Sequence, residues 1–271
     1  MSTGSFSDAA AAAEAARLDA AEQARVQVRQ TTLEHPDLAI DDAYRIQDAW
    51  RELRLGRGEQ ITGHKIGLTS RAMQTAMKID TPDSGFLTDA MMFDAGDVIE
   101  AAAYTDARIE VELAFVLGRD LSGPDVGISD VLAATDYVIP ALELIAARTH
   151  RIDPESGRSR TVVDTIADNA ANGGVITGGR PVRPDEVDLR WVSALLFRNG
   201  TLEETGVAAA VLNHPARGIA WLARRYATLG RQLDAGQLVL AGSFTRPIDV
   251  AAGDVFHVEY GPLGSIALRF S

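Results

Sequence analysis

Two glutamates stand two residues apart in an otherwise apolar stretch. Glu110 and Glu112 lie within Arg108–Leu117, and a β-strand there would point both carboxylates to the same face. Farther along that face come Ala114 and Val116, small apolar residues that indicate a covered face. Two neighbouring carboxylates in a partly buried place raise each other's pKa unless a cation neutralises them. The pattern therefore predicts either a site for a hard divalent cation or, more commonly, an edge strand whose glutamates face solvent.

A third carboxylate stands alone in a second apolar stretch. Glu143 lies in the middle of residues 137–145, and a glutamate is almost never fully buried without a partner. It therefore needs a cation or a basic side chain. If it faces Glu110 and Glu112, the three carboxylates supply the oxygen ligands that suit Mg²⁺ or Mn²⁺ and leave positions open for water and substrate.

Lysine is scarce in this chain. Of 26 basic residues only Lys65 and Lys78 are lysines. Lys65 lies in the short apolar stretch 63–67, which we expect inside, where burial tunes an ammonium group as it cannot tune a guanidinium. The alternative is a lysine held in an ordinary salt bridge. Lys78 is expected on the surface of a helix.

Composition excludes several classes of function. The 271 residues are 46% hydrophobic and 24% charged, which is typical of a globular protein. The net charge of −12 argues against nucleic acid and against an anionic membrane surface. No segment has the run of about 20 apolar residues that spans a bilayer. The first residues lack the basic start of a secretory signal, so we expect a cytoplasmic protein.

Other chemistries find no support in the residue types. The chain has no cysteine, which removes disulfides, thiolate metal sites and cysteine nucleophiles. Neither the serines nor the glycine pairs stand in a nucleophile-elbow or dinucleotide-binding context. The histidines have no metal-ligand spacing, and we expect structural roles for four of them: His64, His150, His214 and His257.

The elements that would position these residues fall into two parts. Residues 1–62 form a helical N-terminal region, in which Ala43, Ile46, Trp50 and Leu53 lie on one stripe of a helix. Residues 63–271 form a mixed β domain, so the fold class is α+β, with a mostly antiparallel β-sandwich or roll. We expect strands at 108–117, 137–145, 189–199, 237–241 and 254–260, helices at 69–78, 129–135 and 215–229, and a surface loop at 151–160.

Four motifs resemble one branch of a known family. They are His64–Ser70, Pro82–Gly85, Arg108–Phe115 and Asp136–Glu143. Together they resemble the hydratase and decarboxylase branch of the fumarylacetoacetate hydrolase superfamily. Further stretches, Ile152–Asn172 and Arg198–Gly206, are most similar to hydratases that act on 2-oxohept-4-ene-1,7-dioate in homoprotocatechuate breakdown.

The resemblance implies a catalytic site. It implies that Glu110, Glu112 and Glu143 hold a divalent metal, Mg²⁺ or Mn²⁺, and that Lys65 and Asp83 lie in the active site. No catalytic histidine matches the one that the superfamily's C–C hydrolases use, which argues against hydrolysis. The far carboxylate of the substrate should meet an arginine, and the candidates are Arg148, Arg151 and Arg160, with Ser243 as a further polar contact.

The resemblance also leaves functional alternatives open. Within the branch these are hydration of 2-oxopent-4-enoate and decarboxylation of a 4-oxalocrotonate-type substrate. Outside enzymes, the chain would be a metal-stabilised partner subunit of a hydratase–decarboxylase complex. The family implies a homo-oligomer, with association with a decarboxylase as a further possibility.

Overall fold

The computed structural model describes residues 6–70, 74–75, 79 and 81–271. Its α-helices are α1 (Asp8–Ala24), α2 (Thr31–Glu34), α3 (Ile40–Leu55), α5 (Ile128–Ala134), α6 (Val162–Ala167) and α7 (Ala216–Thr228). Its strands are β1 (Ile61–Gly67), β2 (Asp83–Thr88), β3 (Met92–Asp94), β4 (Val98–Ile99), β5 (Arg108–Leu117), β6 (Thr135–Ile145), β7 (Asn172–Thr177), β8 (Ser193–Arg198), β9 (Thr201–Val207), β10 (Leu238–Leu240), β11 (Ile248–Asp249), β12 (Val255–Glu259) and β13 (Ser265–Phe270). None of the helices in this part of the chain has the length and apolar composition that crossing a membrane requires.

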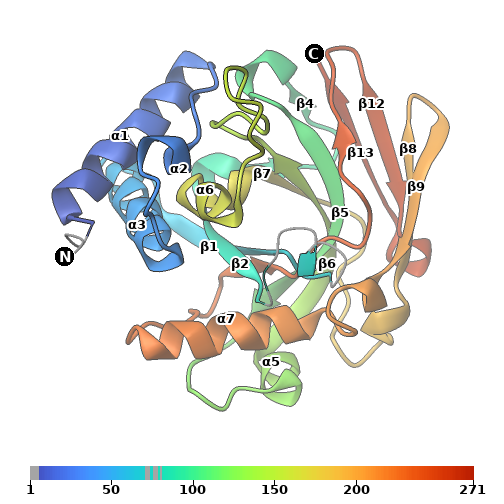
Figure 1. Ribbon diagram of the computed structural model, residues 1–271. Helices are drawn as coiled ribbons and strands as arrows, with labels where there is room; N and C mark the ends of the chain where they lie inside the picture. Colours follow the sequence, from blue (N-terminus) through green and yellow to red (C-terminus); the bar gives the residue numbers. More distant parts are fainter. Residues whose placement is uncertain (1–5, 71–73, 76–78, 80) are drawn as a thin grey trace.

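The N-terminal helices form a small apolar cluster of their own. Ala-rich α1 begins where the Ser7 hydroxyl accepts a hydrogen bond from the amide of Ala10, a usual N-cap. The stripe of α3 buries Ala43, Ile46 and Trp50, whereas Leu53 is 37% exposed, contrary to expectation. The cluster is completed by α6, and Figure 1 shows α1, α3 and α6 side by side. The boundary after residue 62 stays a prediction.

Two sheets, together with helices α5 and α7, make up most of the rest of the chain. One has eight strands in the order β2-β1-β10-β5-β6-β7-β3, with β11 also paired to β5, and it curls strongly (Figure 1). The other has the order β4-β13-β12-β8-β9. Eight of the eleven described strand pairs are antiparallel, which confirms the predicted α+β class with a mixed, mostly antiparallel sheet.

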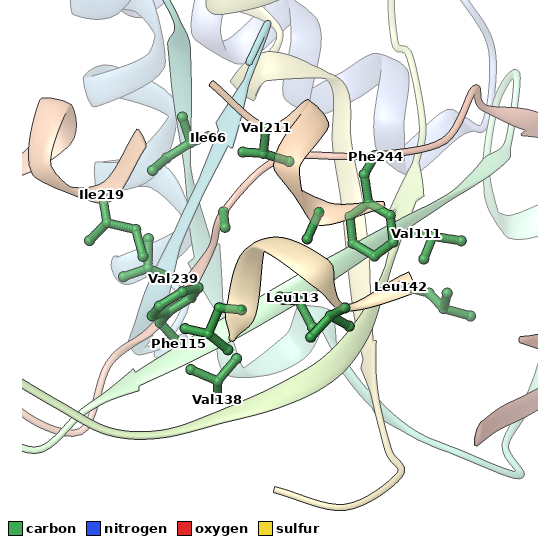
Figure 2. Close-up of a cluster of buried hydrophobic side chains, with 14 of the residues drawn as sticks. Ile66, Val111, Leu113, Phe115, Val138, Leu142, Val211, Ile219, Val239 and Phe244 are labelled. Atoms are coloured by element: carbon green, nitrogen blue, oxygen red, sulfur yellow. The ribbon is translucent and has the colours of Figure 1, made fainter. Parts of the chain in front are cut away.

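The long strand β5 separates the apolar core from the candidate site. Its residues Val111, Leu113 and Phe115 point into the core with Val239 and Phe244 (Figure 2). The opposite face carries the two glutamates and then Ala114, which is fully buried in a second, smaller apolar cluster. The expected alternation is therefore correct, and the second face is covered.

Most expected elements occur, with two differences in detail. The segment 189–199 begins as a 3₁₀ turn at Leu189–Trp191 and becomes a strand only at Ser193. Several strands were not expected, among them β7, β9 and β13. Most of the helix expected at 69–78, including Lys78, falls outside the described residues.

His64 is a buried histidine with a structural partner. Its Nδ1 lies 3.0 Å from the hydroxyl of Tyr226, and the two rings meet edge to face. Burial, aided by the charge of Arg51, lowers the pKa of His64 to about 4. Between pH 6.5 and 4 the unfolded chain therefore binds the His64 proton more readily, so the contribution of His64 to the free energy of unfolding falls as pH falls, by about 1.4 kcal/mol per pH unit.

We expect His64→Asn, which keeps an acceptor for Tyr226 and does not titrate, to remove this contribution, so that lowering the pH from 6.5 to 4 destabilises the variant less than the parent. Urea unfolding at intervals between pH 4 and 7.5 measures it. The matched control is His257→Asn, since the His257 side chain is 43% exposed. Parallel curves for the parent and His64→Asn would contradict the assignment.

Candidate active site

Strand pairing brings the three glutamates to one face. In the antiparallel pair β5–β6, Glu110 is directly opposite Glu143, and Glu112 is two residues along from Glu110. Directly opposed residues share a face of the sheet, and so do residues two apart. One oxygen from each carboxylate lies within 4.8 Å of the others. Glu112 and Glu143 are buried, and Glu110 is half-buried.

The same register places Lys65 beside the carboxylates. Lys65 pairs with Leu240 of β10, and Leu240 pairs with Ala114 of β5, on the face that carries the glutamates. The Lys65 Nζ lies 3.1 Å from a carboxylate oxygen of Glu143. It also donates to the carbonyl of Ala170 at 3.0 Å. Lys65 is thus a buried ammonium at the edge of the glutamate cluster.

Asp83 adds a fourth carboxylate on the far side of Lys65. It opposes Gly67 in the β1–β2 pair, where a Cβ would stand 2.3 Å from its Oδ1 and 3.1 Å from the Lys65 Nζ. Glycine at position 67 therefore leaves the room for both groups. The Asp83 Oδ1 is buried and has no hydrogen-bond partner among the described residues.

The charged groups in this cluster shift one another's pKa values. Burial and then the charge of Glu143 raise the pKa of Glu110 to about 8. The same two causes raise the pKa of Glu112 well above its usual range. Burial disfavours the charged form of Lys65, but the carboxylates of Glu143 and Asp83 outweigh it and raise the Lys65 pKa. Lys65 is therefore a stable cation, and it alone does not neutralise the carboxylates.

The residues present fit a divalent cation. The donor set consists of carboxylate oxygens, which Mg²⁺, Mn²⁺ and Ca²⁺ prefer. Mutual repulsion between Glu110, Glu112 and Glu143 is what a cation would relieve. Two buried oxygens nearby, Asp83 Oδ1 and Asn172 Oδ1, also lack a partner in the described part of the chain.

A left-handed turn of three residues holds the Lys65 side. Asn169, Ala170 and Ala171 have φ values of 48°, 50° and 58°, a conformation that costs a non-glycine residue about 1–2 kcal/mol. The Asn169 side chain fixes the turn by bonding both the amide and the carbonyl of Phe86. The turn points the Ala170 carbonyl at Lys65, so this strained backbone conformation helps to hold the ammonium group in place.

Two further contacts at the site were not predicted from the sequence. The Asn172 side-chain amide donates to Glu143 at 3.1 Å, and the backbone amide of Gly242 donates to Glu112 at 2.7 Å. Gly242 has a φ of 114°, and a Cβ there would meet the side chain of Thr69 at 2.1 Å. Polar asparagines in the otherwise uncharged and small or apolar stretch 169–176 are the one sequence signal that could have pointed to Asn172.

The four residues expected to contact the substrate differ in whether other groups already occupy their polar atoms. Arg148 is fully buried, and other groups already occupy its guanidinium. It donates to the carboxylate and carbonyl of Asp168 and to the carbonyl of Asn172. It also lies 4.8 Å from the centre of the Trp50 ring. The Ser243 hydroxyl is engaged with the backbone of Thr245. These two are therefore not brought to the site as free donors.

Of the four expected substrate contacts, Arg151 and Arg160 remain as candidates. Burial raises the pKa values of Glu110 and Asp83, and the positive charges of Arg151 and Arg160, respectively, oppose part of these rises. In the structure Arg151 bonds Asp106, and Arg160 lies 3.8 Å from Asp168.

Comparison with known proteins gives consistent matches. Residues 60–271 match the family described as fumarylacetoacetate (FAA) hydrolase, C-terminal. The chain is 58% identical over 256 residues to 2-oxo-hept-4-ene-1,7-dioate hydratase of Escherichia coli, covering 94% of this chain and 96% of that one. It is 38% identical over 235 residues to 2-keto-4-pentenoate hydratase of Paraburkholderia xenovorans (strain LB400), covering 87% and 85% of the two chains.

A solved structure has nearly the same fold. It is 4-oxalocrotonate decarboxylase from Pseudomonas putida G7 complexed with magnesium and adipate, with a TM-score of 0.93 and 35% identity, covering 98% of this chain and 99% of that one. The same decarboxylase complexed with calcium and acetate matches equally well. The similarity thus extends over the whole fold as well as the sequence.

Proposed function

The chain belongs to the fumarylacetoacetate hydrolase family, and from that premise we propose that it is a divalent-metal-dependent hydratase of 2-oxohept-4-ene-1,7-dioate. The product is 4-hydroxy-2-oxoheptane-1,7-dioate, formed in aromatic catabolism. The observation that carries the proposal is the cluster of Glu110, Glu112 and Glu143 beside the buried ammonium of Lys65. The 58% identity to the hydratase of Escherichia coli supports the choice of substrate.

Glu110, Glu112 and Glu143 would hold the metal. Mg²⁺ is our assignment and Mn²⁺ an acceptable substitute, since the donors are all hard oxygens. The similar decarboxylase has been solved with magnesium and with calcium. When bound, the ion supplies a positive charge that orients the 2-oxo acid head and stabilises negative charge developing on its oxygens.

Lys65 would stabilise the enolate form of the substrate. Its ammonium is buried, keeps its charge because of the surrounding carboxylates, and is held in place by Glu143 and by the Ala170 carbonyl. A fixed positive charge in a water-poor place favours an enolate oxygen far more than the same charge in water.

Asp83 would move protons. Burial raises the pKa of its carboxyl, which brings it nearer to the range that suits an acid–base group at neutral pH. Its Oδ1, with no other partner in the described residues, would accept a proton from C3 and return it at C5. The double bond then lies beside the ketone, C4 becomes electrophilic, and a water that Asp83 orients adds its hydroxyl at C4 and a proton at C3.

One experiment tests substrate and metal together. Hydration of the seven-carbon dicarboxylate dienol is compared with that of 2-hydroxypenta-2,4-dienoate, each with Mg²⁺ and after chelation with EDTA. We expect loss of dienol absorbance only with metal, and a kcat/KM at least about tenfold higher for the dicarboxylate, the effect of one favourable contact of about 1.4 kcal/mol. Equal rates with and without metal would end the metal proposal, and a preference for the five-carbon acid would move the chain to the 2-oxopent-4-enoate hydratases.

A decarboxylase is the second candidate, because the fold matches 4-oxalocrotonate decarboxylase with a TM-score of 0.93. It would use the same stabilised enolate but release CO₂ instead of adding water. Release of CO₂ from 2-oxohex-3-enedioate, without hydration of the dienol, would favour it.

We further propose that the protein works in the cytoplasm as a homo-oligomer. The two hydratases that it is similar to come from bacteria, and a chain without cysteine needs no oxidising compartment for disulfides. Sedimentation of the purified protein, alone and mixed with a decarboxylase of this branch, tests the oligomer and the partner.

A further inference from the structure

The loop between β6 and α6 holds two arginines side by side. The amide of Arg160 donates to the carbonyl of Arg151 at 2.8 Å, and Ile152 and Ser159 form an antiparallel bridge next to them. Arg151 and Arg160 are therefore directly opposed, and opposed residues of an antiparallel pair project to the same face.

The base of this loop is rigid. The Gln30 side-chain amide donates to three of its carbonyls, those of His150, Arg151 and Arg158. Inside the loop the buried carboxylate of Asp153 accepts from the amide and hydroxyl of Ser156. The two guanidinium groups are thus held on a fixed support, which lowers the entropy cost of binding a ligand between them.

Each of the two arginines has a buried nitrogen without a partner. The Arg160 side chain is 9% exposed, and its Nη1 forms no hydrogen bond with any described residue. The closest carboxylate oxygen belongs to Asp168, 3.8 Å away, and Asp168 is already bonded to Arg148. Within the same set of residues, the Arg151 Nη2 is likewise buried and unbonded, although its Nε bonds Asp106.

Two opposed and partly unsatisfied guanidinium groups are unfavourable by themselves. Burial, and after it the charge of Arg151, lower the pKa of Arg160 to about 10. Leaving a buried charged donor without an acceptor destabilises the folded protein by several kcal/mol. Such donors in a native fold therefore indicate where an acceptor binds. A carboxylate has the charge and the paired oxygens that two guanidinium groups require.

We propose that Arg151 and Arg160 bind the far carboxylate of the substrate and so select a dicarboxylate over a monocarboxylate. The inference rests on the proposed hydratase function and deepens it. Arg160 lies 3.8 Å from Asp168, two residues before the Ala170 carbonyl that holds Lys65. Arg151 bonds Asp106, four residues before Glu110. Both arginines thus lie next to segments that carry site residues, so a substrate whose 2-oxo acid head lies at the glutamates would extend its other end toward them. Arg148, the third candidate, serves the fold instead.

Ligand binding separates this role from a structural one. The probes are 2-oxoheptanedioate, which has both carboxylates and no double bond, and 2-oxopentanoate, which lacks the far carboxylate. Their dissociation constants are measured by calorimetry in the presence of Mg²⁺ for the parent, Arg160→Met, Arg160→Lys and Arg151→Met. The matched control is Arg158→Met, an exposed arginine of the same loop.

We expect Arg160→Met and Arg151→Met to weaken binding of 2-oxoheptanedioate by about 10- to 100-fold, as loss of a charge-assisted hydrogen bond does. Binding of 2-oxopentanoate should stay within about threefold of the parent, the scatter expected for a site the change does not touch. Arg160→Lys should recover part of the loss, and Arg158→Met should change neither ligand. Equal weakening of both ligands, or of neither, would overturn the inference.

A failure of this inference can be distinguished from a failure of the proposed function. If the parent does not hydrate the seven-carbon dienol, the proposed function fails. If the parent hydrates it but Arg160→Met and Arg160→Lys keep the parent's preference for the dicarboxylate, only the role of the arginines fails. Because Arg151 also bonds Asp106, the two Arg160 variants decide the case should Arg151→Met not fold.

Discussion

Replacing Glu110 by glutamine is expected to lower turnover by about 10³-fold and to remove the stabilisation that Mg²⁺ gives the parent. The size follows from the value of one electrostatic group at a reacting centre, about 10²–10³-fold, together with weaker retention of the ion. Of the three glutamates, Glu110 is the one whose replacement removes the fewest other contacts. Its side chain makes no hydrogen bond in the described part of the chain, whereas Glu112 bonds Gly242 and Glu143 bonds Asn172.

Without metal, we expect Glu110→Gln to be more stable than the parent. Burial and the charge of Glu143 disfavour the charged form of Glu110, so a neutral glutamine relieves repulsion in the metal-free protein. We expect a higher melting temperature than the parent's in EDTA, and almost no increase on adding Mg²⁺, where the parent gains about 2.7 kcal/mol at 100 times the dissociation constant. The control is Glu203→Gln, an exposed glutamate of β9, which should behave as the parent. An unchanged response to Mg²⁺ in Glu110→Gln would refute the assignment of this ligand.

The shared face of Glu110 and Glu112 could be predicted from sequence because it depends on local periodicity. Alternation along residues 108–117 fixes Glu110 and Glu112 on one face, and a carboxylate inside an apolar strand demands a partner. The family resemblance then joined Glu143 to them, and the β5–β6 register agrees. The predicted fold class and the branch of the family are confirmed. Both predictions depend on long stretches of sequence and not on single contacts.

What could not be predicted depends on contacts between distant segments. The left-handed conformation of Ala170 and Ala171 has no local signal, since alanine avoids it and only the surrounding fold imposes it. Arg148, Arg151 and Arg160 have the same side chain, and only their partners separate a structural arginine from two with free donors. Strand β9 was missed because it has only two apolar residues, Leu202 and Val207, and no buried position. Strand β13 does alternate, with Ile266, Leu268 and Phe270 buried, so this pattern was present in the sequence.

Replacing Lys65 by methionine is expected to slow the reaction by about 10²–10⁴-fold while the metal still binds. Methionine fills much of the same space without the charge, so the effect reports the ammonium group. Loss of the 3.1 Å pair with Glu143 should also destabilise the metal-free protein, by about 3–5 kcal/mol as for other broken buried ion pairs. A cation bound at the glutamates compensates part of that loss, so Mg²⁺ should raise the melting temperature more in Lys65→Met than in the parent.

The two variants therefore have opposite responses to metal, and this contrast distinguishes a ligand from a neighbouring cation. Glu110→Gln loses turnover and metal together, whereas Lys65→Met loses turnover and keeps the metal. A rate within a few-fold of the parent would remove Lys65 from the mechanism. Because the chain has no cysteine of its own, Lys65→Cys offers a rescue: alkylation with 2-bromoethylamine in denaturant, followed by refolding, rebuilds an ammonium at this one position. Recovery of turnover after alkylation would show that the charge is what position 65 contributes, and a correctly refolded, alkylated but inactive protein would show that it is not.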